Sequence, residues 1–287
     1  MYLPPGSSRW LEKRCDETDA ADDLAERIGS LLLDDRFSDI SLIVEGEALP
    51  AHRIILACSC EYFRALLFGD LEESRKTQIV LEDVPLRGMK IFLTYVYTAK
   101  LDLKELEAAT ALEVIGIAHM YGLEKLLRKL SDFLKRNLSV ESACSILERA
   151  ELLELDSLSE ACRDYMGHHA SAILKTREFC HLPAKTLSRL LSRDTFCVEE
   201  VEIVIAIKLW REMNPDHGNF PEILEVVRLS LISTADLVTI VQDSGLFSAE
   251  RLLEVIRGKE IDRIDPRGKL IKRRHPAPAN HRVFTLT

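Results

Sequence analysis

Apolar positions in the first half of the chain recur at two spacings, one typical of helices and one typical of strands. Residues 40–44 alternate between apolar and polar, and turn residues 45–47 lead into a second extended stretch, which predicts a hairpin. Residues 78–81 (Gln-Ile-Val-Leu) predict another short strand. Helical spacing marks the segments 19–32, 53–68, 89–96, 103–120 and 123–138. The first half is therefore predicted to combine a few strands with about six helices.

The second half shows helical spacing almost throughout, with one ambiguous segment. Residues 201–207 are rich in β-branched side chains, which favours a strand by propensity alone. The apolar pattern continues, however, and Ile203, Ile207 and Trp210 follow one another at i, i+4 and i+7. We therefore expect a helix that is buried within a bundle. Further helices are predicted at 143–152, 157–169, 183–192, 221–227, 234–241 and 249–257.

The length and composition fit two ordinary domains. The chain has 287 residues, with only 12 Gly and 10 Pro, which favours helices over a turn-rich sandwich of sheets. A break is expected at 137–139, where Ser139 is suited to cap the next helix. The predicted fold is helix-rich α+β, with short strands flanked by helices and then an all-α domain. The predicted ranges are 1–17 (flexible leader), 18–138 (first domain), 139–262 (helical domain) and 263–287 (basic flexible tail).

Charge and cysteine usage exclude several classes of protein. A formal net charge of −9 argues against nucleic-acid binding by the whole chain, because phosphate contacts need clustered Lys and Arg. Membrane association is not expected, since no uncharged apolar run approaches the ~20 residues of a membrane helix and residues 1–10 lack the apolar core of a secretory signal. The 7 cysteines are odd in number and scattered, which predicts reduced thiols and a cytoplasmic protein, with the nucleus as an alternative.

The tail is the one strongly basic segment, and two interpretations of it remain open. One is a basic patch that directs nuclear import or binds an acidic surface. The other is a solvated end without a specific partner. Its basic residues are Lys269, Lys272, Arg273, Arg274 and Arg282.

Several motifs, in the same order as in a known family, extend over about 110 residues of the first half. They are Phe37-Ser38-Asp39-Ile40 with Leu42, the stretch from Pro50 to Ala57, Tyr62 to Leu67, Leu71 to Ser74 and Tyr95 to Thr98. These motifs resemble the core of the BTB (POZ) domain. The second half resembles the helical BACK domain in the stretches Phe179 to Pro183, Leu191 to Asp194 and Trp210. BACK follows BTB in many cullin-3 adaptors, so the resemblance implies a non-enzymatic adaptor of a ubiquitin ligase.

The resemblance implies two binding surfaces. BTB domains dimerise through their first helix, so its apolar face should be buried in a homodimer, although an intramolecular role for that face is the alternative. The face consists of Leu24, Ile28, Leu31 and Leu32. Leu71 and Glu73 fit the hydrophobic-x-Glu pattern through which BTB domains bind cullin-3, and Tyr97 is a further expected contact. The alternative for Leu71 to Glu73 is a helix-ending loop with solvated acids.

No catalytic, metal-binding or cofactor-binding residue is predicted. The sequence contains no Gly-x-Ser-x-Gly, Gly-rich phosphate loop or His-Glu-x-x-His pattern, and His52 is interpreted as a structural hydrogen-bonding residue. The expected partners are a second copy of the chain, cullin-3 and a protein substrate of unknown identity. MATH domains and kelch repeats, which read substrates in related adaptors, are not recognised, so we expect a fragment or a short form. A BTB scaffold that recruits other proteins without cullin-3 is the alternative function.

Overall fold

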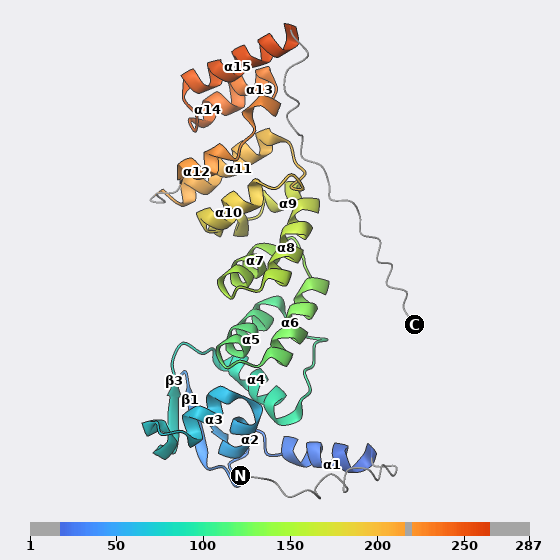
Figure 1. Ribbon diagram of the computed structural model, residues 1–287, viewed down its shortest axis with the longest axis vertical. Coiled ribbons are helices and arrows are strands. Elements are labelled where there is room, and N and C mark those ends of the chain that lie inside the picture. The colour runs from blue at the N-terminus through green and yellow to red at the C-terminus, as the bar shows by residue number, and fades with distance from the viewer. Residues whose placement is uncertain (1–17, 216–219, 265–287) are drawn as a thin grey trace, which may run out of the picture. The chain divides into compact units, whose positions relative to one another are not determined.

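The computed structural model describes residues 18–215 and 220–264, and the chain divides into two compact units after Leu130 (Figure 1). Residues 1–17 and 265–287, which carry the predicted leader and the basic tail, lie outside the described residues. The first unit begins with α1 (Thr18–Gly29), β1 (Ile40–Val44), β2 (Glu47–Ala51), α2 (Arg53–Ser59), α3 (Glu61–Phe68) and the short 3-10 helix η2 (Glu72–Arg75). It continues with β3 (Gln78–Leu81), α4 (Leu86–Thr98), α5 (Ala108–Met120) and the start of α6 (Glu124–Arg136).

The three strands form one small sheet in the order β2-β1-β3. Strands β1 and β2 are antiparallel and place Leu42 opposite Leu49, while β3 runs parallel to β1. The hairpin turn uses Glu45 and Gly46, both with positive φ (50° and 83°), which matches the twist that a two-residue turn requires. Side chains on one face of β1 are buried and those between them are half-buried, so the predicted alternation and hairpin are confirmed.

The core of the first unit is built on an aromatic cluster. The ring of Phe63 on α3 lies 4.9 Å from that of Tyr121 and 6.4 Å from that of Phe92 on α4, measured between centroids. Phe63 and Phe92 are fully buried, and Tyr121 is 2% exposed. Helix α5 packs against α4 and is apolar on most of its surface. This packing gives the loops around the sheet a rigid base.

One helix starts later than its apolar pattern predicted. We expected a helix from residue 103, but α5 begins at Ala108. The side chain of Asp102 accepts a hydrogen bond from the backbone N–H of Lys104 at 2.9 Å. This local bond favours a turn and competes with helix formation, so the segment before α5 stays non-helical.

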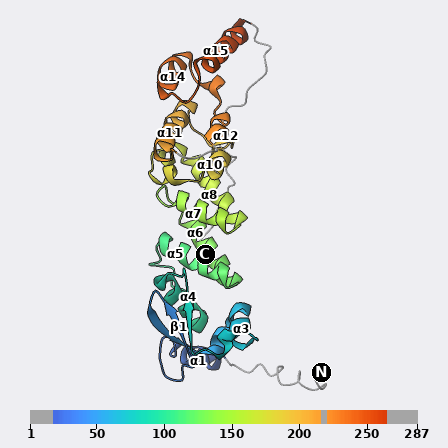
Figure 2. The ribbon, with the colours of Figure 1, turned by 90° about the vertical axis from the view of Figure 1, so that its left-hand side faces the viewer.

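The second unit is helical among its described residues, and its helices follow one another in sequence order in both views (Figures 1 and 2). The first are α7 (Ala143–Leu152), α8 (Asp156–His168), α9 (Ala170–Ile173), η3 (Glu178–His181), α10 (Ala184–Leu191) and α11 (Glu200–Met213). The later ones are α12 (Phe220–Glu225), η4 (Leu229–Leu231), α13 (Thr234–Asp236), the π-helical turn η5 (Leu237–Val241), α14 (Gln242–Ser244) and α15 (Ala249–Ile264).

The ambiguous β-branched segment is the helix α11, as predicted. Ile203, Ile207 and Trp210 are all fully buried on it. The indole N–H of Trp210 donates to the carbonyl oxygen of Leu182 at 2.9 Å, so the buried polar group is satisfied. Tertiary burial therefore overrides the strand propensity of this segment.

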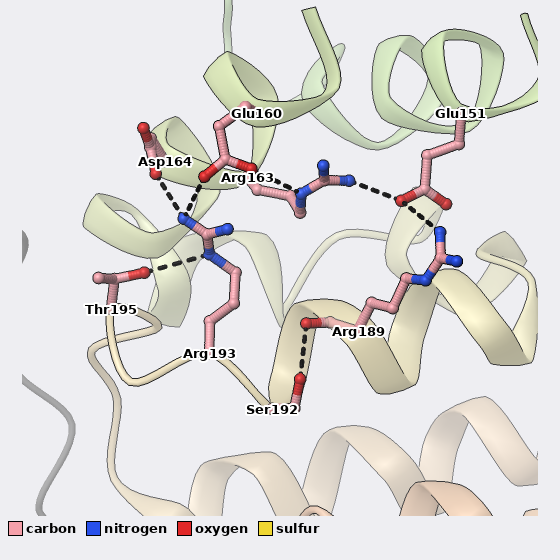
Figure 3. Close-up of polar contacts among 8 residues, drawn as sticks. All are labelled: Glu151, Glu160, Arg163, Asp164, Arg189, Ser192, Arg193 and Thr195. Carbon is pink, nitrogen blue, oxygen red and sulfur yellow. Dashed lines mark hydrogen bonds and ion pairs between the residues drawn. The ribbon is translucent and has the colours of Figure 1, made fainter. Parts of the chain in front are cut away.

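Glu151 at the end of α7 joins three helices through its carboxylate (Figure 3). It accepts hydrogen bonds from Arg163 on α8 at 2.7 Å and from Thr186 on α10 at 2.5 Å. The guanidinium of Arg189 lies 3.8 Å away. Because Glu151 is only 14% exposed, these bonds compensate the loss of water around its charge and fix the α7–α8 pair on α10.

Arg193 makes a second link within the same unit (Figure 3). Its guanidinium donates to Asp164 at 2.6 Å and pairs with Glu160 at 2.8 Å, and both acceptors lie on α8. These contacts hold the pKa of the Glu160 carboxyl below its usual range. Their contribution to stability is therefore present above the ordinary pKa of a glutamate and is lost as the pH falls through the lowered value.

Gly167 on α8 allows the loop that follows α10 to pack directly on that helix. A Cβ atom at Gly167 would lie 2.6 Å from the carbonyl oxygen of Thr195, which is backbone and cannot move aside easily. Gly167→Ala is therefore expected to destabilise the second unit by about 1–3 kcal/mol. Urea unfolding followed by the fluorescence of Trp210, at the core of this unit, measures the change.

Gly258→Ala on α15 is the matched control for Gly167→Ala. No heavy atom of the described chain lies within 4 Å of a Cβ built there, outside the helix's own backbone and adjacent residues. Alanine at this position should raise stability by up to about 1 kcal/mol, since glycine is a poor helix former. Equal urea midpoints for the two variants would contradict the close packing assigned to Gly167.

Candidate partner-binding surfaces

The loop after α3 presents a leucine at the start of a short, well-bonded turn. Leu71 precedes η2, and its side chain is 51% exposed. Its carbonyl oxygen accepts hydrogen bonds from the backbone N–H of Ser74 at 3.1 Å and from the Ser74 hydroxyl at 2.7 Å. The backbone of Leu71 is thus held in place while most of its side chain faces solvent. Such an exposed apolar group on a fixed turn is suited to fill a groove of a partner.

Glu73 lies within the same turn and carries a charge that is already paired. Lys76 donates to its Oε1 atom at 2.9 Å, and this bond holds the pKa of Glu73 below its usual range. The side chain of Glu73 is 33% exposed, so the carboxylate remains charged and reachable from solvent. Leu71 and Glu73 therefore lie on one short turn, and their shared role in binding stays a prediction.

Several other apolar side chains of the first unit are exposed and were not predicted as binding residues, and two of them lie on α2 and α3. Phe68, at the end of α3, is 58% exposed, and Ile54 on α2 is 62% exposed. Both helices are short, with 7 residues in α2 and 8 in α3. Exposed apolar groups on this unit are thus not limited to Leu71.

The structure corrects the expectation for Tyr97. This residue lies on α4 with its side chain only 4% exposed, so it does not offer a surface to a partner. Its hydroxyl accepts a hydrogen bond from the backbone N–H of His52 and lies 2.9 Å from the Nδ1 atom of that residue. Burial raises the pKa of Tyr97 to about 12. The structure thus places Tyr97 in the core rather than on an accessible surface, because its hydroxyl is hydrogen-bonded to His52.

His52 takes the structural role that the sequence analysis assigned to it. Its side chain is 6% exposed, and its second ring nitrogen lies 3.1 Å from the carbonyl oxygen of Arg36. Together with the bond to Tyr97, this contact ties the loop before β1 to the start of α2 and to α4. His52 is thus a satisfied buried histidine, without the exposed nitrogen that acid–base catalysis needs.

The face of the first helix is only partly covered by the chain itself. On α1, Leu24 is 59% exposed and Ile28 is half-buried. The predicted helix was too long, because α1 ends at Gly29; Leu31 and Leu32 lie in the turn that follows it and are half-buried. Helix α1 packs against α4, which accounts for the covered part. The chain itself therefore covers one side of this face and leaves Leu24 exposed, while burial of Leu24 in a homodimer stays a prediction.

Phe37, in the loop between α1 and β1, is a further exposed apolar side chain outside the predicted residues. It is 86% exposed and has a positive φ of 62°, and Leu33 in the same loop is 37% exposed with a φ of 56°. Left-handed backbone is uncommon for bulky residues and marks a constrained loop. The sequence carries no local signal for such a conformation, since Phe37 follows ordinary turn residues.

Neither a metal centre nor a membrane span is found where the chain is described. Across residues 18–215 and 220–264, no cluster of three or more His, Cys, Asp or Glu side chains is arranged to hold a metal ion. None of the helices described there combines the length and apolar character needed to cross a membrane. Burial raises the pKa values of Cys144 and Cys162 to about 12, so these thiols are poor nucleophiles and poor ligands.

Comparison with known families matches both halves of the chain. The model of the BTB/POZ domain matches residues 28–138, and the model described as "BTB And C-terminal Kelch" (BACK) matches residues 143–242. The chain therefore belongs to the proteins that join a BTB domain to a BACK domain. These matches confirm the resemblance seen in the sequence motifs and the helix-rich α+β fold class.

Among its relatives are proteins named BTB/POZ domain-containing protein 9. The chain is 35% identical to the Drosophila melanogaster protein over 241 residues and 33% identical to the Homo sapiens protein over 259 residues. These alignments cover 84% and 89% of this chain but only 33% and 42% of the relatives, so the chain spans well under half of their length.

The chain is also similar to a more distant relative and to a solved structure. Kelch-like protein 40a of Danio rerio is 28% identical over 215 residues, covering 74% of this chain and 35% of that protein. The structure of the BTB domain of human gigaxonin matches 42% of this chain and 95% of its own, with 25% identity and a TM-score of 0.36.

Proposed function

We propose that this protein is a dimeric, non-enzymatic adaptor that links a cullin-3 ubiquitin ligase to a protein substrate. A BTB domain followed by a BACK domain is the arrangement typical of such adaptors. The observation that carries the proposal is the exposed Leu71 beside the charged Glu73, on a fixed turn of the BTB unit. The proposal places this activity in the cytoplasm.

Each of the two residues contributes a different interaction in the proposed complex. Leu71 enters an apolar groove of the cullin, and complete burial of such a side chain stabilises a complex by about 1.5–3 kcal/mol. Glu73 accepts hydrogen bonds from cullin donors and so fixes the orientation of the turn. Lys76 donates to one carboxylate oxygen of Glu73 at 2.9 Å, and a partner can reach the carboxylate through the 33% of the side chain that remains exposed.

The proposed dimer uses the open side of α1 together with Phe37. A symmetric twofold dimer buries the same patch on both copies, so the interface contains each residue of the patch two times, once from each copy. Leu24 and Phe37 are the two most exposed large apolar side chains of this region, at 59% and 86%. A dimer of this kind presents two cullin sites and two BACK domains, which would hold a substrate bivalently.

Calorimetric titration of the purified chain with the N-terminal domain of cullin-3 tests the proposal. We expect one cullin domain to bind per chain with a Kd of about 1 μM or below, which corresponds to roughly −8 kcal/mol. Light scattering on the same sample should report a dimer. A dimer that gives no heat of binding would instead support the alternative, a BTB scaffold that recruits other proteins.

A further inference from the structure

Arg53 reaches three backbone carbonyl groups that flank the Leu71–Glu73 turn. Its Nη1 atom donates to the carbonyl oxygen of Leu67 at 3.1 Å, before the turn, and to that of Ser74 at 2.9 Å, after it. Its Nη2 atom donates to the carbonyl oxygen of Lys76. One guanidinium therefore connects the two ends of the segment that presents Leu71.

These carbonyl groups need a donor from outside their own helices. Leu67 lies in the last turn of α3, where helical carbonyl groups have no partner further along the helix. Ser74 lies in η2 and Lys76 directly follows it, and a helix of this length satisfies few of its own groups. A guanidinium presents five N–H donors in a fixed planar fork, so it can bind several acceptors at once, whereas a lysine ammonium acts as a single point.

The backbone of Arg53 is in turn hydrogen-bonded to the residue that precedes β1. Its backbone N–H donates to the Oδ1 atom of Asp39 at 2.8 Å, and Asp39 directly precedes β1. The side chain of Asp39 thus serves the first N–H of α2, one of the donors that a helix leaves unpaired at its start. The connection runs from the sheet through Asp39 and Arg53 to both ends of the turn.

We infer that Arg53 is the positioning residue for the partner-binding turn, holding Leu71 and Glu73 in their binding geometry before the partner arrives. The identity of the partner rests on the proposed function. The role of Arg53 in the free chain is independent of it. A turn that is ordered beforehand loses less conformational freedom on binding and so binds more tightly. Arg53 acts through the backbone and does not contact the partner.

Arg53→Gln tests the role in the free protein, with Arg64→Gln as the matched control. Arg64 lies on α3, is 58% exposed and pairs with Glu61 at 2.9 Å, so both variants lose one positive charge from the same unit. Hydrogen exchange is measured at the amides of Ser74 and Lys76, which donate to the carbonyl oxygens of Leu71 and Glu73 within the turn. We expect exchange at both amides to be at least tenfold faster in Arg53→Gln and unchanged in Arg64→Gln.

Hydrogen exchange at the amides of α5 distinguishes an effect of Arg53 on the turn alone from an effect on the stability of the whole unit. If Arg53 positions the turn, exchange in α5 stays at the wild-type rate in Arg53→Gln. Exchange that rises equally in α5 and in the turn would show that Arg53 stabilises the whole unit, and unchanged exchange in the turn would show no role; either result overturns the inference. If Arg53→Gln does not fold, Arg53→Lys replaces it. We then expect exchange in the turn to be about threefold faster than in wild type, because lysine keeps the positive charge but lacks the planar set of N–H donors.

Titration with the N-terminal domain of cullin-3 tests the consequence for binding. We expect Arg53→Gln to weaken binding at least fivefold, Arg53→Lys to lie between it and wild type, and Arg64→Gln to stay within twofold of wild type. A wild-type affinity in Arg53→Gln, despite faster exchange in the turn, would overturn the inference. No binding by the wild type would refute the proposed function, while the exchange result would still decide whether Arg53 holds the turn.

Discussion

Leu24→Asp is expected to convert the protein from a dimer to a monomer at micromolar concentration. Leu24 is 59% exposed in the single chain, and covering this exposed part in a dimer would contribute about 1–2 kcal/mol per copy. Because a twofold interface contains this residue twice, one substitution removes about 2–4 kcal/mol and weakens association roughly 30- to 10³-fold. Aspartate in place of leucine would also bring two negative charges into the interface, which adds to the loss.

Light scattering coupled to gel filtration measures this change. The wild-type chain should give twice the monomer mass of 32.6 kDa, and Leu24→Asp should give the monomer mass. Leu253→Asp on α15 is the matched control, because Leu253 is 53% exposed and lies outside the proposed interface. A monomeric wild type, or a Leu24→Asp variant that remains dimeric, would refute the assignment of this face to dimerisation.

Leu71→Asp is expected to weaken cullin-3 binding at least tenfold, equivalent to about 1.4 kcal/mol or more. The substitution places a charge in an apolar groove, and a few central contacts of this kind usually dominate an interface. The fold should be unaffected, because Leu71 is 51% exposed and lies in a turn rather than in the core. Glu73→Ala should have a similar effect, since it leaves cullin donors without an acceptor.

Calorimetry with the cullin-3 N-terminal domain checks both substitutions, with circular dichroism to confirm folding. Glu72→Ala is the control for Glu73→Ala, because it removes the same charge from an exposed neighbour in the same turn. Leu253→Asp again controls for Leu71→Asp, with nearly the same exposed fraction. If the folded Leu71 and Glu73 variants bind as tightly as wild type, the turn is not the cullin-3 site.

Elements defined by local patterns were predictable from the sequence. The alternation of β1 and the turn at Gly46 lie within a few residues of each other, so short-range rules suffice for the hairpin. Helix α11 was also predictable, because its apolar residues recur at helical spacing over three turns in spite of strand-favouring side chains. The late start of α5 was missed, since the side chain of Asp102 accepts a hydrogen bond from the backbone N–H of Lys104 and so favours a turn before the helix.

Tertiary packing decided which of the predicted site residues are accessible. Leu71 and Tyr97 belong to equally clear motifs, yet one is 51% exposed and the other 4%. The difference comes from a partner 45 residues away in sequence, because the Tyr97 hydroxyl is used by His52 in the core. No spacing rule contains that information. The exposure of Phe37 likewise depends on a left-handed backbone that local composition does not predict.

The sequence by itself determined the class of protein, the two domains and the turn that carries Leu71 and Glu73, because motif order and hydrophobic periodicity are properties of the chain. Only the tertiary structure showed that Arg53 holds that turn, since its three acceptors lie 14 to 23 residues further along the chain. It also divided the α1 face into a covered and an open side. Contacts between distant segments arise from packing, and packing depends on all the elements at once.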